Sequence, residues 1–354
     1  MVRIVYCVVM ICGLLSANAA ADRKLDYTQL FEQGRTEYLN GKFAAAAVSL
    51  NSALRAIDRS DQAGRASVLA MLGDVYTSED ELSKADQAYR ESLALYEKLD
   101  NKKQIAHLLR DIAAVYSLQR HDDEALRLLQ KALKLTKPIH DAGLEAEVLN
   151  IMGVVYYRQH NNGRAENFFK QALDVTSKSQ VSTDVGELLN NLGNVYQAEH
   201  KYGEAESLLK QALKYVEDEL GASHPELIFT LSSLGGLYTA TARYSDAEQQ
   251  YQRALAILEP GGSDFDTRIA RLLHALGVMY VKAGRKEEAD AALARATDIA
   301  RRNLSQHADM VSIIDDYAAV LKDQGKSGKA AELRAETRRA RATADLVTTV
   351  PPTF

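Results

Sequence analysis

The segment Leu192-Gly193-Asn194-Val195-Tyr196 decides the fold, because related segments recur along the whole chain. Each copy opens on a large apolar residue, continues with a small residue and closes on a tyrosine. The copies begin at positions 72, 112, 152, 192, 234 and 276, so the period is 40 residues in the first half and 42 in the second. A fixed period of this length is the signature of a repeat array.

A second element follows each copy at a constant offset. Twelve residues after Gly193 stands Ala205, and seven residues later stands Ala212; every copy has an alanine and then a small residue at these places. Each set of positions falls on one face of a helix. Small residues let two helices approach closely, and tyrosine fills the space beside them, which fits a chain with 17 Tyr and 7 Phe. Each repeat is therefore predicted to be a pair of helices.

The pattern resembles that of the tetratricopeptide repeat family, whose unit is two antiparallel helices with this alternation of small and large residues. The resemblance covers residues 27–341 and, with weaker copies at both ends, gives about eight repeats. The unit is longer than the usual length of about 34 residues, and the stretch with Gly221 and Pro225 is similar to repeats of kinesin light chains. The resemblance implies an all-α solenoid whose helix pairs form a right-handed superhelix.

Residues 1–19 have the features of a secretory signal peptide. Arg3 precedes an apolar run over residues 4–15, and small residues allow cleavage after Ala19 or Ala21. The run is too short to span a bilayer, which takes roughly 20 apolar residues. The mature chain is thus expected to be exported, periplasmic or secreted, without stable membrane insertion. An uncleaved anchor or a buried first helix is the alternative interpretation of the same run.

Both cysteines, Cys7 and Cys12, lie inside this leader, so the mature chain would contain no thiol and no disulfide. A lipid-modified Cys12 is a further alternative, although Ile11 stands where a lipoprotein would carry a small residue. At the other end, residues 344–354 show no periodicity and are expected to form a disordered tail.

No constellation of catalytic residues stands out. Gly325-Lys326-Ser327 resembles the end of a phosphate-binding loop, but Val320 occupies the place of its first glycine. His121, His160 and His200 recur almost with the repeat period, which places them in successive turns and not around one metal ion. The net charge of −5 gives no reason to expect nucleic-acid binding. We therefore expect neither an enzyme nor a cofactor or metal site.

What remains is the concave groove that the resemblance implies along the first helix of each pair. Asparagine side chains there can hydrogen-bond the backbone of an extended peptide. The expected function is an extracytoplasmic scaffold or adaptor that binds a peptide or helix of a partner protein; the alternative is a sensor of a small ligand or signal peptide, acting through a change of the superhelix. The groove residues predicted from the repeat register are Arg110, Asn150, Tyr157, Glu187, Asn190, Asn194, Gln197, Ser232, Arg271 and His274.

Overall fold

A computed structural model of the chain describes residues 26–179, 185–260, 266–304 and 310–349. Within these ranges every regular element is a helix and no β-strand occurs. The all-α solenoid predicted from the repeats is confirmed. The leader at residues 1–19 lies outside the described residues.

The chain divides into two compact units, Met1–Thr183 and Asp184–Phe354. In unit 1 a helix over residues 26–39 is followed by seven others. These are α2 (Phe43–Ala56), α3 (Gln62–Ser78), α4 (Leu82–Lys98), α5 (Lys102–Leu118), α6 (Asp122–Ile139), α7 (Ala142–Arg158) and α8 (Asn162–Ser179). Unit 2 contains α9 (Val185–Ala198), α10 (Tyr202–Leu220), α11 (Leu227–Ala240), α12 (Tyr244–Leu258), α13 (Asp266–Lys282), α14 (Lys286–Asn303), α15 (Val311–Asp323) and α16 (Ser327–Thr349).

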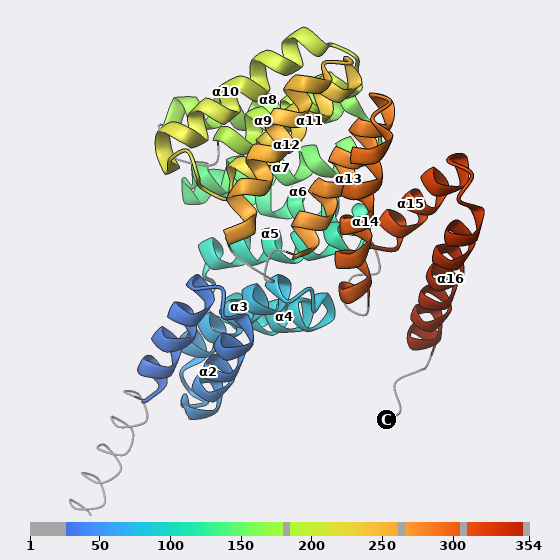
Figure 1. Cartoon of the computed structure of the whole chain (residues 1–354). Helices are drawn as coiled ribbons and strands as arrows, with labels where there is room; N and C mark the ends of the chain where they lie inside the picture. Colours follow the sequence, from blue (N-terminus) through green and yellow to red (C-terminus); the bar gives the residue numbers. More distant parts are fainter. Residues whose placement is uncertain (1–25, 180–184, 261–265, 305–309, 350–354) are drawn as a thin grey trace, which may run out of the picture. The chain divides into compact units, whose positions relative to one another are not determined.

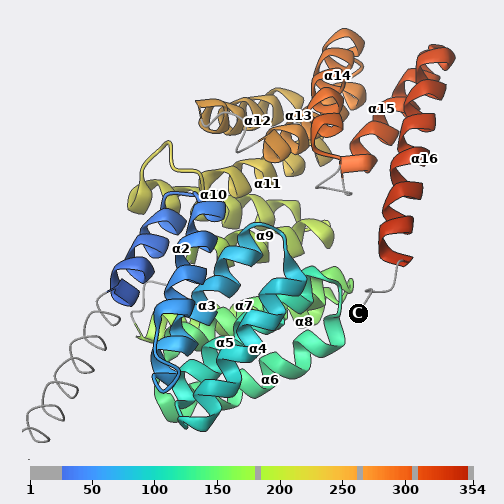
Figure 2. The ribbon, with the colours of Figure 1, turned by 90° about the horizontal axis from the view of Figure 1, so that it is seen from below.

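The helices pack as successive antiparallel pairs, which Figures 1 and 2 show from two directions. We call the first helix of each pair its A helix and the second its B helix; α3, α5 and α7 are A helices of unit 1, and α9, α11, α13 and α15 are those of unit 2. The pairs number eight among the described residues, as the sequence predicts.

The small residues of the repeat lie where the A and B helices of a pair meet. A Cβ atom added to Gly193 would lie 2.9 Å from Cγ of Leu209, and one added to Gly153 would lie 2.5 Å from Cε1 of Phe169. Ala205 on the opposing helix is fully buried. A side chain at any of these places would force the helices apart. The contact positions predicted from the repeat are thereby confirmed.

The turns between helices use a left-handed residue at a regular interval. Among the described residues, positive φ angles occur every twenty residues from Asp80 through Asp100, Arg120 and His140 to His160, and again at His200. Aspartate and histidine tolerate this conformation better than most residues. The recurrence of His160 and His200 therefore follows from the geometry of the turn.

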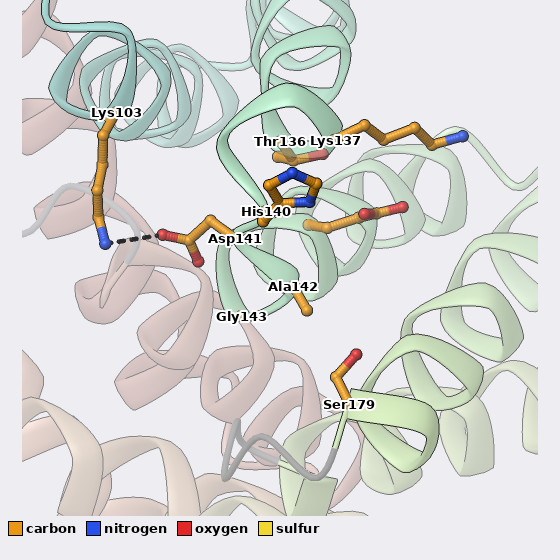
Figure 3. A pocket seen from close by; sticks show the side chains of 9 residues that line it. Lys103, Thr136, Lys137, His140, Asp141, Ala142, Gly143 and Ser179 are labelled. Carbon is orange, nitrogen blue, oxygen red and sulfur yellow. Dashed lines mark ion pairs between the residues drawn. The ribbon is translucent and has the colours of Figure 1, made fainter.

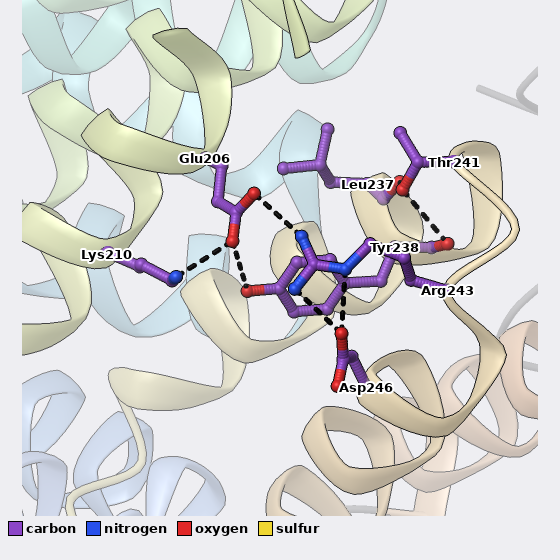
Figure 4. Close-up of polar contacts among 7 residues, drawn as sticks. All are labelled: Glu206, Lys210, Leu237, Tyr238, Thr241, Arg243 and Asp246. Atoms are coloured by element: carbon purple, nitrogen blue, oxygen red, sulfur yellow. Dashed lines mark hydrogen bonds and ion pairs between the residues drawn. The ribbon is translucent and has the colours of Figure 1, made fainter. Parts of the chain in front are cut away.

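Neighbouring pairs in unit 2 are joined by a polar contact that uses the repeat tyrosine (Figure 4). The Tyr238 hydroxyl of α11 donates to Glu206 of α10 across 3.1 Å, and Arg243 pairs with the same carboxylate at 2.8 Å while its guanidinium lies 4.2 Å from the centre of the Tyr238 ring. The next repeat has the same arrangement, with Tyr280 and Arg285 on Glu248. We call this contact the tyrosine staple; in these two repeats it gives the tyrosine hydroxyl a role that phenylalanine could not fill.

The C-terminal end differs from the expectation. A disordered tail was predicted from residue 344, but α16 continues to Thr349. Asp345 to Thr349 contain no helix breaker, and the first proline stands at Pro351. Residues 350–354 of the predicted tail lie outside the described residues, so the structure does not test the prediction there.

Candidate functional site

Neighbouring A helices form a layer, which comprises all four A helices in unit 2 and α5 and α7 in unit 1. In unit 2, α11 contacts both α9 and α13, and α13 contacts α15; in unit 1, α5 contacts α7. We call the side of this layer that points away from the B helices the A-helix face. It corresponds, within each unit, to the surface on which the groove residues were predicted.

One border of the A-helix face of unit 2 is made of amides on α9. Asn191, Asn194 and Gln197 follow one another along this helix and are half-buried. Amide side chains offer both donors and acceptors without a net charge. This border can therefore satisfy polar groups of a ligand without demanding a charged one.

The middle of the face, on α11, is made of very small residues. Ser232, Ser233 and Gly236 are half-buried and present little side-chain bulk. Gly235 and Gly236 differ sharply although they are adjacent. A Cβ on Gly235 would lie 2.6 Å from the Tyr251 ring, whereas one on Gly236 would have its nearest neighbour, Nε2 of Gln197, at 3.8 Å. Packing requires the first glycine but does not require the second.

The other border of this face, on α13, is apolar. Ala275 and Val278 are half-buried, and Val281 is 43% exposed. On α11 Phe229 is 63% exposed, at the position where other repeats carry Glu147, Glu187 or Arg271. An exposed phenylalanine at a position that other repeats fill with charge is a surface feature that folding does not require.

The predicted residues around this face are charged or paired. Glu187 and Arg271 are exposed, as expected for groove positions. His274 of α13 lies 2.9 Å from the Asp316 carboxylate of α15, so this pair links two neighbouring A helices. Asn194, Gln197 and Ser232 complete the predicted residues that the structure brings onto one face.

Asn190 differs from the prediction. It was expected to be an exposed groove residue, but it is only 6% exposed, and its Oδ1 atom accepts no hydrogen bond from the described part of the protein. Its register is not the reason, because Asn150 and Ser232 occupy the same place in their repeats and are half-buried; the packing around this one repeat buries Asn190. Asn190 cannot contact a ligand on this face without local rearrangement.

The A-helix face of unit 1 has a different chemistry, dominated by charge. Arg110 of α5 donates from Nη1 to Glu147 of α7 at 2.6 Å, and its Nε lies 2.9 Å from Asp111 of the same helix. On α3, Asp74 accepts a hydrogen bond of 2.7 Å from the hydroxyl of Tyr89, a buried residue of α4. One guanidinium, that of Arg110, is thus the cation near three carboxylates.

Burial changes the acidity of these groups. It raises the pKa of Asp74, against the opposing effects of the Tyr89 hydrogen bond and Arg110. Burial also raises the pKa of Asp111 to about 7; Arg110 opposes the shift, and Asp74 and Glu147 add to it by repulsion. Desolvation and the charge of Arg110 lower the pKa of His107.

The remaining predicted residues of unit 1 are less distinctive. Asn150 and Tyr157, both on α7, are half-buried, and burial raises the pKa of the Tyr157 hydroxyl. Asn150 belongs to unit 1, whereas Asn194 belongs to unit 2.

Unit 1 also has an open hollow of about 740 Å³ at the start of α7 (Figure 3). Asp141 occupies its wall and caps α7 by accepting from the amide of Leu144 at 3.0 Å, while Lys103 lies 3.1 Å from its carboxylate. The cap hydrogen bond and Lys103 lower the pKa of Asp141. Asp141 and Lys103 thus have structural partners. Its lining consists of Lys103, Thr136, Lys137, His140, Asp141, Ala142, Gly143, Glu145 and Ser179.

The described ranges contain no cluster of three or more His, Cys, Asp or Glu side chains arranged to hold a metal ion. None of the helices found there is long and apolar enough to cross a bilayer.

Comparison with known proteins shows to which family this architecture belongs. A family model of the tetratricopeptide repeat matches residues 104–178 and 184–259, and a second model of that repeat matches residues 66–99 and 270–303. Together they cover more than half of the chain. The chain belongs to the tetratricopeptide repeat family. A search of curated proteins found no significant match for this tetratricopeptide repeat protein.

Solved structures share its fold at low sequence identity. The apo form of RapI is 15% identical, with a TM-score of 0.55, and the alignment covers 90% of this chain and 98% of RapI. BtubC (BKLC) from P. vanneervenii is 21% identical, with a TM-score of 0.52, over 65% of this chain and 91% of that one. A Rap protein complexed with Competence and Sporulation Factor is 16% identical, with a TM-score of 0.51, over 90% and 76% of the two chains. At these identities the likeness shows the fold alone.

Several residues that shape the two faces were not predicted from the sequence. Phe229 and Gly236 in unit 2, and Asp74, Asp111 and Glu147 in unit 1, were absent from the predicted groove. A comparison of equivalent positions could have found Phe229, Gly236, Asp74 and Asp111, because each of them differs in kind from its counterparts in other repeats. Asp74, for example, occupies the position of Val154, Asn194 and Gly236 in the repeat segment.

Proposed function

We propose that this tetratricopeptide repeat protein is an extracytoplasmic scaffold or adaptor, and that it binds a peptide or helix of a partner protein on the A-helix face of unit 2. Membership of the family supports a role in protein–protein interaction. The leader residues support export, and the chemistry of the A-helix face supports the place of binding.

The observation that carries the proposal is the contrast between Gly235 and Gly236. Glycine in the interior of a helix costs about 1 kcal/mol relative to alanine. Contact with Tyr251 accounts for Gly235, but a Cβ at Gly236 would fit without strain. A glycine that packing does not require is explained when the backbone of another molecule must approach the helix closely.

The flanks of Gly236 suit an uncharged segment with at least one apolar side chain. Asn194 and Gln197 on α9 can exchange hydrogen bonds with backbone amides and carbonyls of the partner. Phe229 and Val281, both largely exposed, offer apolar surface for a side chain. Burial of apolar area contributes roughly 25 cal/mol per Å², so this contact would supply affinity and the amides would supply orientation.

A sensor of a small ligand or signal peptide is the second candidate. The solved Rap protein complexed with Competence and Sporulation Factor motivates it, since that protein has the same fold. Under this alternative, ligand binding would change the arrangement of the repeats, and small-angle scattering of the protein would change on addition of the ligand.

The test compares three baits in a pull-down from envelope extract, followed by quantitative mass spectrometry. The baits are the parent chain without residues 1–19, Gly236→Gln and Gly203→Gln. Gly236→Gln places a long side chain on the A-helix face, while Gly203 is an exposed glycine of α10 with no atom within 4 Å of an added Cβ. Gly203→Gln is therefore a matched control on a B helix.

A partner that binds this face should be captured by the parent and by Gly203→Gln and lost, at least tenfold, from Gly236→Gln. Titration of the purified partner against the three chains then gives the affinities directly. Equal binding to all three would contradict the proposed face.

Export has its own test: the native protein should have the mass of a chain that begins at Ala20 or Asp22, and an intact Met1 or an attached lipid would contradict it.

A further inference from the structure

Three neighbouring repeats of unit 1 each contribute one carboxylate to a common cluster. Asp74 comes from α3, Asp111 from α5 and Glu147 from α7, and Arg110 is the cation that these carboxylates share. Arg110 and Asp111 have side chains that are 26% and 21% exposed, so solvent screens them only in part. With all groups ionised the cluster would contain three negative charges and one positive charge.

The guanidinium of Arg110 contacts two carboxylates at once. Nη1 of Arg110 is 2.6 Å from Glu147 on the neighbouring A helix, and Nε is 2.9 Å from Asp111. Asp74 receives its hydrogen bond from Tyr89. When carboxylates share one partly buried site, one of them is protonated more readily than an isolated carboxyl. Asp111 is the most affected: burial raises its pKa most, and repulsion by Asp74 and Glu147 adds to that shift.

We propose that Asp74, Asp111 and Glu147, gathered around Arg110, form a proton-controlled joint between the second, third and fourth repeats. Asp111 takes up a proton as the pH falls through neutrality. Arg110 then pairs with Glu147 on α7 and no longer also with an ionised Asp111. The electrostatic repulsion of Asp74 and Glu147 by Asp111 disappears at the same time. The contact between the three A helices is firmer in the protonated form than in the ionised form.

The other charged or titratable groups around the cluster fit this assignment. Tyr89 of α4 feels both Asp74 and Asp111, which together with burial raise the pKa of its hydroxyl, so it remains a hydrogen-bond donor. On α5, His107 lies one turn before Asp111; its lowered pKa leaves it mostly neutral near pH 7. The B helix α6 places its Asp122 in an ion pair with Arg158.

The direction of the pH effect follows from linkage. Burial and repulsion raise the pKa of folded Asp111 to about 7 from its ordinary value of 3.8. Between these two values the folded chain holds a proton that the unfolded chain has released. The free energy of unfolding must therefore decrease as the pH rises from about 4 to about 7, and the loss is complete above that range.

The direct test follows the side-chain carboxyl carbons of ¹³C-labelled aspartates by NMR between pH 4 and pH 9. We expect Asp111 to titrate with a midpoint near pH 7. Asp74→Asn keeps an acceptor for Tyr89 but removes one negative charge, so it should move that midpoint downwards. A midpoint of Asp111 below about pH 5 in the parent chain would overturn the proposal.

A second measurement reports on the joint itself. Urea unfolding of the whole chain, followed by far-ultraviolet circular dichroism at pH 5.5 to 8.5, should show the transition of unit 1 moving to lower urea as the pH rises. Asp111→Asn should abolish that movement, whereas Asp218→Asn, an exposed control on α10, should retain it. If Asp111→Asn retains the full movement, the proton is not held by this cluster. The test needs no knowledge of the partner, so its outcome is independent of the proposed binding face.

Discussion

Unit 1 and unit 2 are built from the same helix pair but present different A-helix faces. In unit 1, Arg110 pairs with Asp111 on its own helix and with Glu147 on the neighbouring A helix, and Asp74 adds a third carboxylate near this guanidinium. In unit 2 the corresponding layer offers amides on α9, small residues on α11 and apolar residues on α13. The positions that join A to B helices are alike in both units, while those on the A-helix face have diverged.

This difference distinguishes the positions between helices, which the fold requires, from the positions on the A-helix face, which are available for function. A position between two helices accepts only the side chain that fits, so Gly153 in unit 1 and Gly193 in unit 2 have the same role. A position on the A-helix face has solvent on one side and tolerates many side chains. Chemistry that varies from repeat to repeat on that face is therefore where a partner or a regulatory signal can be specified.

The largest effects should come from the shared core, and they should be alike in the two units. Ala125 and Ala205 are both fully buried on B helices. Ala125→Leu and Ala205→Leu should each overpack the helix pair and reduce the free energy of unfolding by about 1–3 kcal/mol. Urea unfolding measures this, with Gly203→Leu on the exposed side of α10 as the control. An unchanged transition in both core variants would show that the repeat register is misassigned.

A smaller effect should separate Tyr280 of unit 2 from Tyr156 of unit 1, because the hydroxyl of Tyr280 forms the tyrosine staple with a glutamate and that of Tyr156 does not. The Tyr280 hydroxyl donates to Glu248 at 2.6 Å, while the equivalent Tyr156 in unit 1 is 3.4 Å from Arg164 and stacks on Phe168. Tyr280→Phe should cost about 1 kcal/mol, as expected for one hydrogen bond. Tyr156→Phe should cost clearly less in the same unfolding assay. Equal costs would mean that the ring, and not the hydroxyl, joins the repeats.

The two adjacent glycines of α11 should respond with opposite signs. Gly236→Ala should increase the free energy of unfolding by up to about 1 kcal/mol, because alanine is the better helix former and its Cβ has room. Gly235→Ala should decrease it by about 1 kcal/mol or more, because its Cβ would overlap the Tyr251 ring. Thermal unfolding of the two variants tests this. A destabilised Gly236→Ala would remove the argument that this glycine is kept for a ligand.

The smallest effect is an acid-dependent one in unit 2, opposite in direction to that of unit 1. Hydrogen bonds from Arg285 and Tyr280 lower the pKa of Glu248. Its stabilising contribution is therefore present above the unfolded pKa, near 4.3, and is lost as the pH falls through the folded pKa. Glu248→Gln should reduce stability at pH 7 by about a few tenths of a kcal/mol, and the difference from the parent should vanish in acid. A difference that persists at pH 3 would show that packing of Glu248 matters more than its charge.

The sequence by itself determined the repeat and its register. Spacing alone identified Gly193 and Ala205 as contact positions, because steric exclusion between two helices leaves a periodic imprint of small residues. It also indicated that the tyrosine of each repeat lies beside the contact. Such features depend on neighbours within one repeat, and those neighbours are at fixed sequence distance.

Only the tertiary structure decided which surface side chains meet. Arg110 and Glu147 are 37 residues apart, and their pairing depends on how far one helix pair is rotated against the next. The same rotation covers Asn190, which the helical register alone had placed on the exposed face. It also brings Asp74, Asp111 and Glu147 into one partly buried site, where repulsion and desolvation alter their acidity. Coulomb energies and burial depend on distances and dielectric surroundings between repeats, and these quantities exist only once the repeats are packed.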